Sequence, residues 1–190
     1  MVDSISFKNV KAKVTVKSLI SVAMIALSTL LPLLFHTILG VQGGTKWLPM
    51  YLPVIIGGCL LGSYYGIGIG ALSPIVSHYI SQLVLSSAMP PYAKLPYMVV
   101  ELAIFGLVAG LFSKKIASNP LASFPAVLAA QVLGRLAGYV MNIITFTGQS
   151  SPYSFAWSVV EAGLTGLYLQ AVLIPIVVIL LAKLIKNERN

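Results

Sequence analysis

The chain has 190 residues, of which 58% are hydrophobic and only 8% are charged. Soluble domains carry about 25% charged residues, so this sequence has too few charges to cover a water-facing surface. The composition excludes an ordinary soluble domain and predicts a protein whose surface lies mostly in lipid, where backbone polar groups pair within helices or closed barrels. The apolar runs are long and continuous rather than alternating, which favours membrane helices.

The net charge of +8 is placed in a way that indicates membrane anchoring rather than nucleic-acid binding. The basic residues form short clusters beside the apolar runs, and they are not interleaved with aromatic residues on an amphipathic surface. Basic flanks hold the cytoplasmic ends of membrane helices, so we expect no nucleic-acid partner. Cys59 is the only cysteine, which excludes an internal disulfide and a CxxC metal or redox pair.

Glycine, proline and lysine divide the chain into six apolar segments, each near the length that a bilayer requires. In chain order, the predicted membrane helices are Val14–Leu39, Leu48–Leu61, Tyr65–Leu85, Pro96–Phe112, Leu121–Phe146 and Tyr153–Leu184. The first is too long for the apolar part of a signal peptide and no cleavage site follows it, so we expect an uncleaved helix. We expect residues 1–190 to form a single all-α integral membrane domain, a bundle of six transmembrane helices.

The distribution of basic residues predicts the orientation of this bundle. With the N-terminus inside, the cytoplasmic segments contain Lys8, Lys11, Lys13, Lys17, Lys114, Lys115, Lys183, Lys186 and Arg189. The outer loops, at about 40–47 and around Pro90, then contain only Lys46 and Lys94. The positive-inside rule therefore predicts cytoplasmic N- and C-termini in a multi-pass protein of the cell membrane.

Pairs of glycines four residues apart recur in the predicted helices. They are Gly66 and Gly70, Gly106 and Gly110, and Gly134 and Gly138. This spacing puts both glycines on one helix face, where a neighbouring backbone can approach closely. The interpretation that we favour is packing inside the bundle, and the alternative is docking of a partner membrane protein.

Three charged residues fall inside the predicted spans, namely Glu101, Arg135 and Glu161. A charge at the centre of a membrane helix costs about 3 kcal/mol, so it is rarely retained without a partner or a function. The predicted topology places all three in or near the outer half of the membrane. They indicate a functional site, and the alternative is a buried ion pair that only fixes helix packing.

Aromatic and polar residues accompany these charges at helical spacing. The fifth predicted span has one polar face, formed by Gln131, Arg135, Tyr139 and Asn142. The fourth and sixth have pairs four residues apart, Tyr97–Glu101 and Trp157–Glu161. These helices predict a pocket that stacks a ring and hydrogen-bonds its edge, and the outer loops, one of which ends at Trp47, are candidates to cover it.

The sequence has none of the residue patterns expected for catalysis or metal binding. It lacks an HExxH or GxSxG motif, a paired acidic motif and a phosphate-binding loop. His36 and His78 lie in different spans with no second ligand nearby, and the adjacent Ser77 and His78 diverge on a helix. We therefore expect no enzyme, no metal and no other cofactor.

Four stretches resemble the substrate-specific S components of energy-coupling factor (ECF) transporters. They are WLPMYLPVIIGG from Trp47, GALSP from Gly70, AMPP from Ala88 and VELAIFGLVAG from Val100. The resemblance extends over nearly the whole chain. It implies high-affinity capture of a small water-soluble vitamin or precursor, together with a transmembrane coupling protein and two cytoplasmic ATPases.

The resemblance also implies which surfaces would act. Docking on the coupling protein would use small residues of the first helix, here Ser18, Ala23 and Ala26, although the strict Ala-x-x-x-Ala motif is absent. The ligand would lie among the first outer loop and spans four to six. A hydroxymethylpyrimidine or pyridoxine type of ligand ranks first, followed by pantothenate, riboflavin and cobalamin. The alternative function is a self-contained secondary transporter driven by protons through Glu101 or Glu161.

Overall fold

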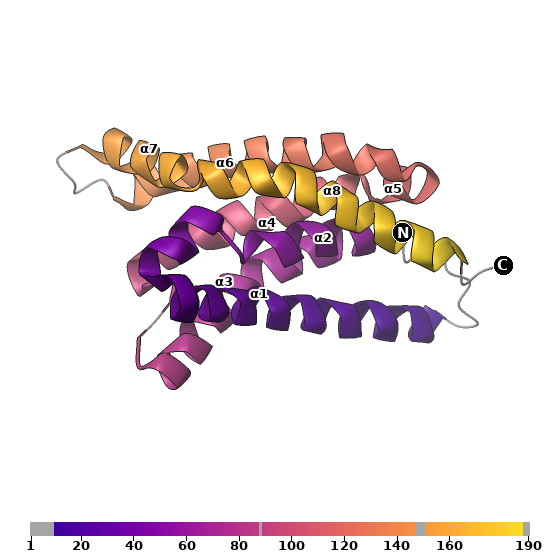
Figure 1. Ribbon diagram of the computed structural model, residues 1–190, viewed down its shortest axis with the longest axis horizontal. Helices are drawn as coiled ribbons and strands as arrows, with labels where there is room; N and C mark the ends of the chain where they lie inside the picture. Colours follow the sequence, from indigo (N-terminus) through magenta and orange to yellow (C-terminus); the bar gives the residue numbers. More distant parts are fainter. Residues whose placement is uncertain (1–9, 88, 147–150, 188–190) are drawn as a thin grey trace.

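The computed structural model describes residues 10–87, 89–146 and 151–187 of the chain. Every regular element within these ranges is a helix, which confirms the predicted all-α class (Figure 1). The elements are α1 (Val10–Trp47), α2 (Tyr51–Leu61), α3 (Ser63–Leu85), η2 (Tyr92–Lys94), α4 (Leu95–Leu111), α5 (Ser113–Ser118), η3 (Pro120–Ala122), α6 (Ser123–Thr145), α7 (Pro152–Ala162) and α8 (Leu164–Asn187).

The predicted number of six membrane-spanning helices is not confirmed. Within the described ranges, five segments are long and apolar enough to cross a membrane: Lys11–Gly40, Ser63–Leu85, Tyr92–Leu111, Pro120–Thr145 and Leu164–Leu184. The sixth apolar helix, α2, has 11 residues and is about 17 Å long, shorter than a hydrocarbon core of about 30 Å. Ten of its residues are buried, so α2 is a core helix enclosed by the others.

The predicted last span, Tyr153–Leu184, is interrupted and forms two helices. α7 ends at Ala162 and α8 begins at Leu164, with Gly163 between them. Gly163 lies against the guanidinium of Arg135, where a side chain would not fit. The prediction of one continuous helix was wrong because the apolar run continues across the break, and only this interhelical contact requires the glycine.

The first predicted helix is present in the structure, whereas the loop that we predicted after it is not. α1 has a non-helical residue at Gly40, with φ of 71°, which kinks the helix close to the predicted end at Leu39. The chain is helical again from there to Trp47, where we predicted a loop. A tight turn at Gly62, with φ of 95°, joins α2 directly to α3, as the glycine-rich sequence indicates.

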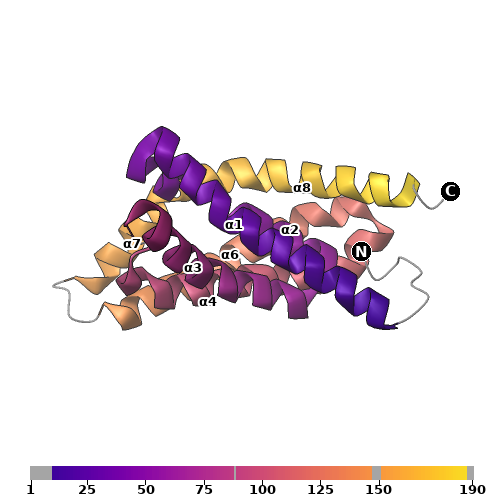
Figure 2. The ribbon, with the colours of Figure 1, turned by 90° about the horizontal axis from the view of Figure 1, so that it is seen from below.

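The helices form a bundle in which α2 lies at the centre (Figures 1 and 2). The beginning of α1, the short helix α5 and the end of α8 lie together at one end, which we call the basic end because it has Lys11, Lys13, Lys114, Lys115 and Lys183. The kink of α1, the start of α2 and the whole of α7 lie at the other end. The first and the last helix of the bundle therefore begin and end, respectively, at the basic end. That this end lies in the cytoplasm stays a prediction.

Glycines bring the backbones of α3 and α4 into direct contact. A Cβ atom on Gly66 would meet the carbonyl of Gly106, one on Gly70 would meet the carbonyl of Leu102, and one on Gly110 would meet Ser63. The pairs predicted from spacing thus pack inside the bundle, as in other small-residue helix contacts. α4 also packs against α6, and the contact between Glu101 and Arg135 lies between these two helices.

Candidate functional site

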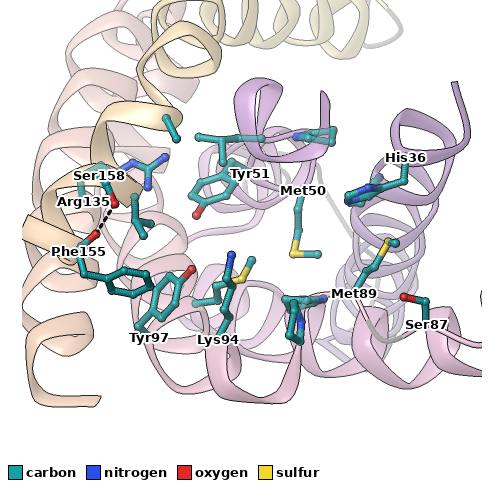
Figure 3. A pocket seen from close by; sticks show the side chains of 18 residues that line it. His36, Met50, Tyr51, Ser87, Met89, Lys94, Tyr97, Arg135, Phe155 and Ser158 are labelled. Atoms are coloured by element: carbon teal, nitrogen blue, oxygen red, sulfur yellow. Dashed lines mark hydrogen bonds between the residues drawn. The ribbon is translucent and has the colours of Figure 1, made fainter. Parts of the chain in front are cut away.

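A cavity of about 480 Å³ lies at the end of the bundle opposite the basic end, between α7 and the start of α2, and Figure 3 shows the side chains that line it. This volume is within the range of small-molecule binding sites. Six parts of the chain line it: α1, the segment before α2 with the start of α2, the connection from α3 to η2 with the end of η2, the start of α4, α6 and α7. The lining residues are Pro32, His36, Leu48, Pro49, Met50, Tyr51, Ser87, Met89, Pro90, Pro91, Lys94, Tyr97, Met98, Arg135, Phe155, Ser158, Val159 and Ala162.

Arg135 brings a positive charge to the wall of this cavity from the middle of α6. The residue is 8% exposed, and its Nη1 atom lies 2.9 Å from Oε1 of Glu101 on α4, which is 1% exposed. The ring of Tyr51 lies 5.3 Å from Cζ of Arg135, an arrangement in which the ring face attracts the cation. Figure 3 shows the guanidinium beside Tyr51. Glu101 lies behind Arg135 and does not line the cavity.

The guanidinium of Arg135 is only partly satisfied by these neighbours. Its Nε and Nη2 atoms are buried and have no hydrogen-bond partner in the described part of the chain. Buried donors are usually paired, so these two are exceptions that require an explanation. Nη2 lies against Gly163 at the junction of α7 and α8.

Polar side chains of α3 hold the connection that forms another wall of the cavity. The hydroxyl of Ser77 donates to the carbonyl of Met89 at 2.9 Å, and the amide of Met89 donates to the hydroxyl of Ser81 at 2.7 Å. Nδ1 of His78 donates to the carbonyl of Pro90 at 2.8 Å. His78 therefore supports this wall of the cavity through its contact with the backbone.

Two glutamines attach α8 to its neighbours close to the site. Nε2 of Gln170 donates to the carbonyls of Trp47 and Leu48, at 3.0 and 2.9 Å, and so fixes the segment that enters α2. Nε2 of Gln131 donates to the carbonyl of Leu167 at 3.0 Å. The predicted polar face of α6 thus serves partly for helix packing. Gln170 was not predicted, because it stands alone in an apolar run.

The structure brings together five of the predicted ligand residues. A narrow gap lies next to the cavity, and this gap has no room for a water molecule. The predicted ligand residues around the gap are Tyr97, Glu101, Arg135, Tyr139 and Asn142. Only Tyr97 and Arg135 of this group also line the larger cavity. Contact of these residues with a ligand stays a prediction.

The other predicted ligand residues lie apart from this group. The side chains of Trp157, 56% exposed, and of Glu161 lie on the outer surface of α7. Trp47 is partly buried beside the cavity without lining it, and the ammonium of Lys46 lies 5.9 Å from its ring centre. The break at Gly163 explains why Trp157 and Glu161 are exposed rather than in the pocket, because the orientation of the short helix α7 is set independently of α8.

Several lining residues have no signal in the sequence. Tyr51 and Met50 belong to the short core helix and the turn before it, and His36 lies in the long apolar run of α1. The Nδ1 atom of His36 is buried without a hydrogen-bond partner among the described residues. Since the helices that carry these side chains are separated in sequence, no periodicity connects them to Arg135.

The part of the chain that the structure describes holds no group of three or more His, Cys, Asp or Glu side chains that would bind a metal ion. Residues 17–181 match the family model of the ECF transporter, substrate-specific component. Comparison with curated proteins and with solved structures gives no match. Because the family model covers most of the chain, and the helical membrane fold agrees with it, the chain belongs to the substrate-specific components of ECF transporters.

Proposed function

We propose that this protein captures a small water-soluble vitamin or vitamin precursor in the cavity beside Arg135 and presents it for uptake. The observation that carries the proposal is the cavity of about 480 Å³ at one end of an ECF substrate-specific component. Tyr51, Tyr97 and Phe155 give this cavity flat apolar surfaces, and Arg135 gives it a buried polar group. Such a combination holds a ring and fixes its orientation.

The proposed orientation places the cavity outside and the basic end in the cytoplasm. Lysines of α1, α5 and α8 at the basic end support it, since cytoplasmic ends collect positive charge. The partners would be a transmembrane coupling protein and two cytoplasmic ATPases. Ser18, Ala23 and Ala26 have exposed side chains on α1, which supports their proposed role in docking on the coupling protein.

The size of the cavity restricts the proposed ligands. A volume of about 480 Å³ suits one small heterocyclic or pantothenate-like molecule, and riboflavin remains a candidate. A corrinoid such as cobalamin is the poorest fit, because a molecule of that size requires a far wider site. The protein would then serve uptake of a small vitamin across the cell membrane.

The experiment that tests this proposal is a fluorescence titration of the detergent-purified protein with a panel of water-soluble vitamins. Trp47 and Trp157 are the only tryptophans, and each precedes a residue that lines the cavity, Leu48 or Ser158. We expect saturable quenching by one compound at nanomolar concentration. The control is Met98→Trp, which fills the cavity and should abolish binding while the protein stays folded; its binding is measured by calorimetry, because the added indole fluoresces itself.

Two results would count against the proposal. One is the absence of saturable binding across the panel by protein that is folded and ligand-free. The other is binding that is unchanged in Met98→Trp, which would locate the ligand elsewhere on the molecule.

A further inference from the structure

The charged groups around the cavity are positive. Among the described residues that line it, Arg135 and Lys94 are cationic, His36 is a third basic group, and none is an aspartate or glutamate. Glu101 is the nearest carboxylate, and it is 1% exposed behind the guanidinium that it contacts. The two positive charges of Arg135 and Lys94 and the negative charge of Glu101 sum to a net charge of +1 at the cavity.

The atoms of Arg135 that remain without a partner belong to one edge of its guanidinium. Glu101 contacts Nη1, whereas Nε and Nη2 are both buried and unpaired within the described chain. The N–H groups of Nε and Nη2 point in the same direction, and their spacing matches the two oxygens of a carboxylate. Buried, charged donors of this kind are costly unless a partner completes them.

The neighbours of Arg135 fix the direction of this edge. Glu101 holds Nη1 from α4, and the ring of Tyr51 lies over the guanidinium from α2. Both contacts come from the protein's own side chains, so they hold the guanidinium in one orientation. Preorganisation of this kind increases affinity because little side-chain freedom is lost on binding.

We propose that the solute is a carboxylate-bearing monoanion whose carboxylate accepts hydrogen bonds from Nε and Nη2 of Arg135. Lys94 provides the second positive charge at the cavity, and the single uncompensated charge matches one carboxylate better than a phosphate dianion. The inference rests on the proposed function and names its substrate class. It moves pantothenate-like acids ahead of neutral pyridoxine-like or hydroxymethylpyrimidine-like solutes.

Helix α7 covers the unpaired edge. Gly163 lies against Nη2, and Val159 of α7 lines both the cavity and the narrow gap around Arg135. Ala156 is the only buried residue of α7. A small outward movement of this helix therefore exposes little core and admits the carboxylate oxygens to the edge of the guanidinium.

The test compares acids with neutral analogues that lack the carboxylate. The probes are pantothenate with panthenol, nicotinate with nicotinamide, and biotin with biotinamide, titrated against the full-length purified protein. We expect an acid to bind saturably and its neutral analogue to bind about 10- to 100-fold more weakly, the usual effect of losing a charged hydrogen bond.

Variants assign this preference to Arg135. The double variant Arg135→Gln/Glu101→Gln removes both charges, so it leaves no buried charge unpaired and should stay folded. We expect it to bind the acid no better than the neutral analogue. Lys94→Met should weaken binding of the acid only, and Lys114→Met, which removes the same charge at the basic end, should change nothing.

The outcomes separate this inference from the proposed function. If a neutral or cationic vitamin such as pyridoxine or thiamine binds tightly and no acid does, the solute is not an anion, but vitamin capture stands. If no vitamin of any charge binds, the proposed function fails and this inference fails with it. If an acid binds equally well to the folded double variant, Arg135 does not hold the carboxylate.

Discussion

At the scale of single residues, the contact between Arg135 and Glu101 has two consequences. It joins α6 to α4 inside the bundle, and it leaves two donors of the guanidinium without a partner among the described residues. Burying two charges costs free energy that their attraction only partly returns, so such a pair is weak evidence for stability. The unpaired donors point instead to a binding role, and the two roles predict different behaviour in a mutant cycle.

Removing one member of the pair should destabilise the protein more than removing both. Arg135→Gln leaves the carboxylate of Glu101 buried without its counter-charge, which costs about 3–5 kcal/mol. Arg135→Gln/Glu101→Gln should recover most of this loss, because two amides can hydrogen-bond to each other. The measurement is the unfolding midpoint of the ligand-free protein in detergent. A double variant no more stable than Arg135→Gln would show that the charges stabilise the bundle.

At the scale of elements, the interface of α3 and α4 depends on the absence of side chains. The backbones of Gly66 and Gly106 are in direct contact. Moving α3 away from α4 would separate the residues of these helices that pack with α2 in the hydrophobic core. The hydroxyl of Ser28 on α1 donates to the hydroxyl of Ser73 on α3 at 2.6 Å, which fixes α3 from its other side. The polar residues that hold the cavity wall, Ser77 and His78, lie further along this same helix.

Adding one methyl group to α3 should therefore have an effect that depends on its position. Gly66→Ala places a Cβ against the carbonyl of Gly106 and should destabilise the fold by about 1–3 kcal/mol or more, as overpacking does. Gly68→Ala is the matched control, since nothing lies within 4 Å of its Cβ position. We expect its unfolding midpoint to equal or exceed that of the parent protein. Equal midpoints for the two variants would contradict the backbone contact.

At the scale of the whole molecule, the basic residues and the cavity lie at opposite ends of the bundle. α2 is too short to span a bilayer, yet it returns the chain from the cavity end toward the basic end (Figures 1 and 2). The ammonium of Lys17 on α1 donates to the carbonyl of Leu61 at 3.3 Å and so satisfies the buried end of this helix. Because α2 returns the chain in this way, the beginning of α1 and the end of α8 lie at the same end of the bundle.

Cysteine labelling can check the proposed orientation. Cys59 is fully buried, so the parent protein should react little with a membrane-impermeant maleimide. Ser87→Cys, at the cavity, should be labelled in intact cells, whereas Lys115→Cys in α5 should be labelled only after the cells are permeabilised. The reverse pattern would place the cavity in the cytoplasm and remove the basis for capture from outside.

Part of the site could be predicted from local spacing. Gln131, Arg135 and Asn142 share a face of α6 because a helix repeats every 3.6 residues, and all three are buried as expected. Trp157 and Glu161 have the same kind of spacing but lie outside. Spacing defines a face of a helix without defining what that face contacts, and the direction of α7 depends on the break at Gly163.

The sequence by itself determined the membrane class of this protein, its helices, the small-residue contacts and the charges that require burial. These features follow from composition and from short-range periodicity, which a single helix already expresses. Only the tertiary structure decided that Glu101 is the partner of Arg135, that α2 is a core helix, and that Tyr51, Lys94 and Arg135 face one cavity. Such contacts join residues far apart in the chain, and they depend on how whole helices pack rather than on any local pattern.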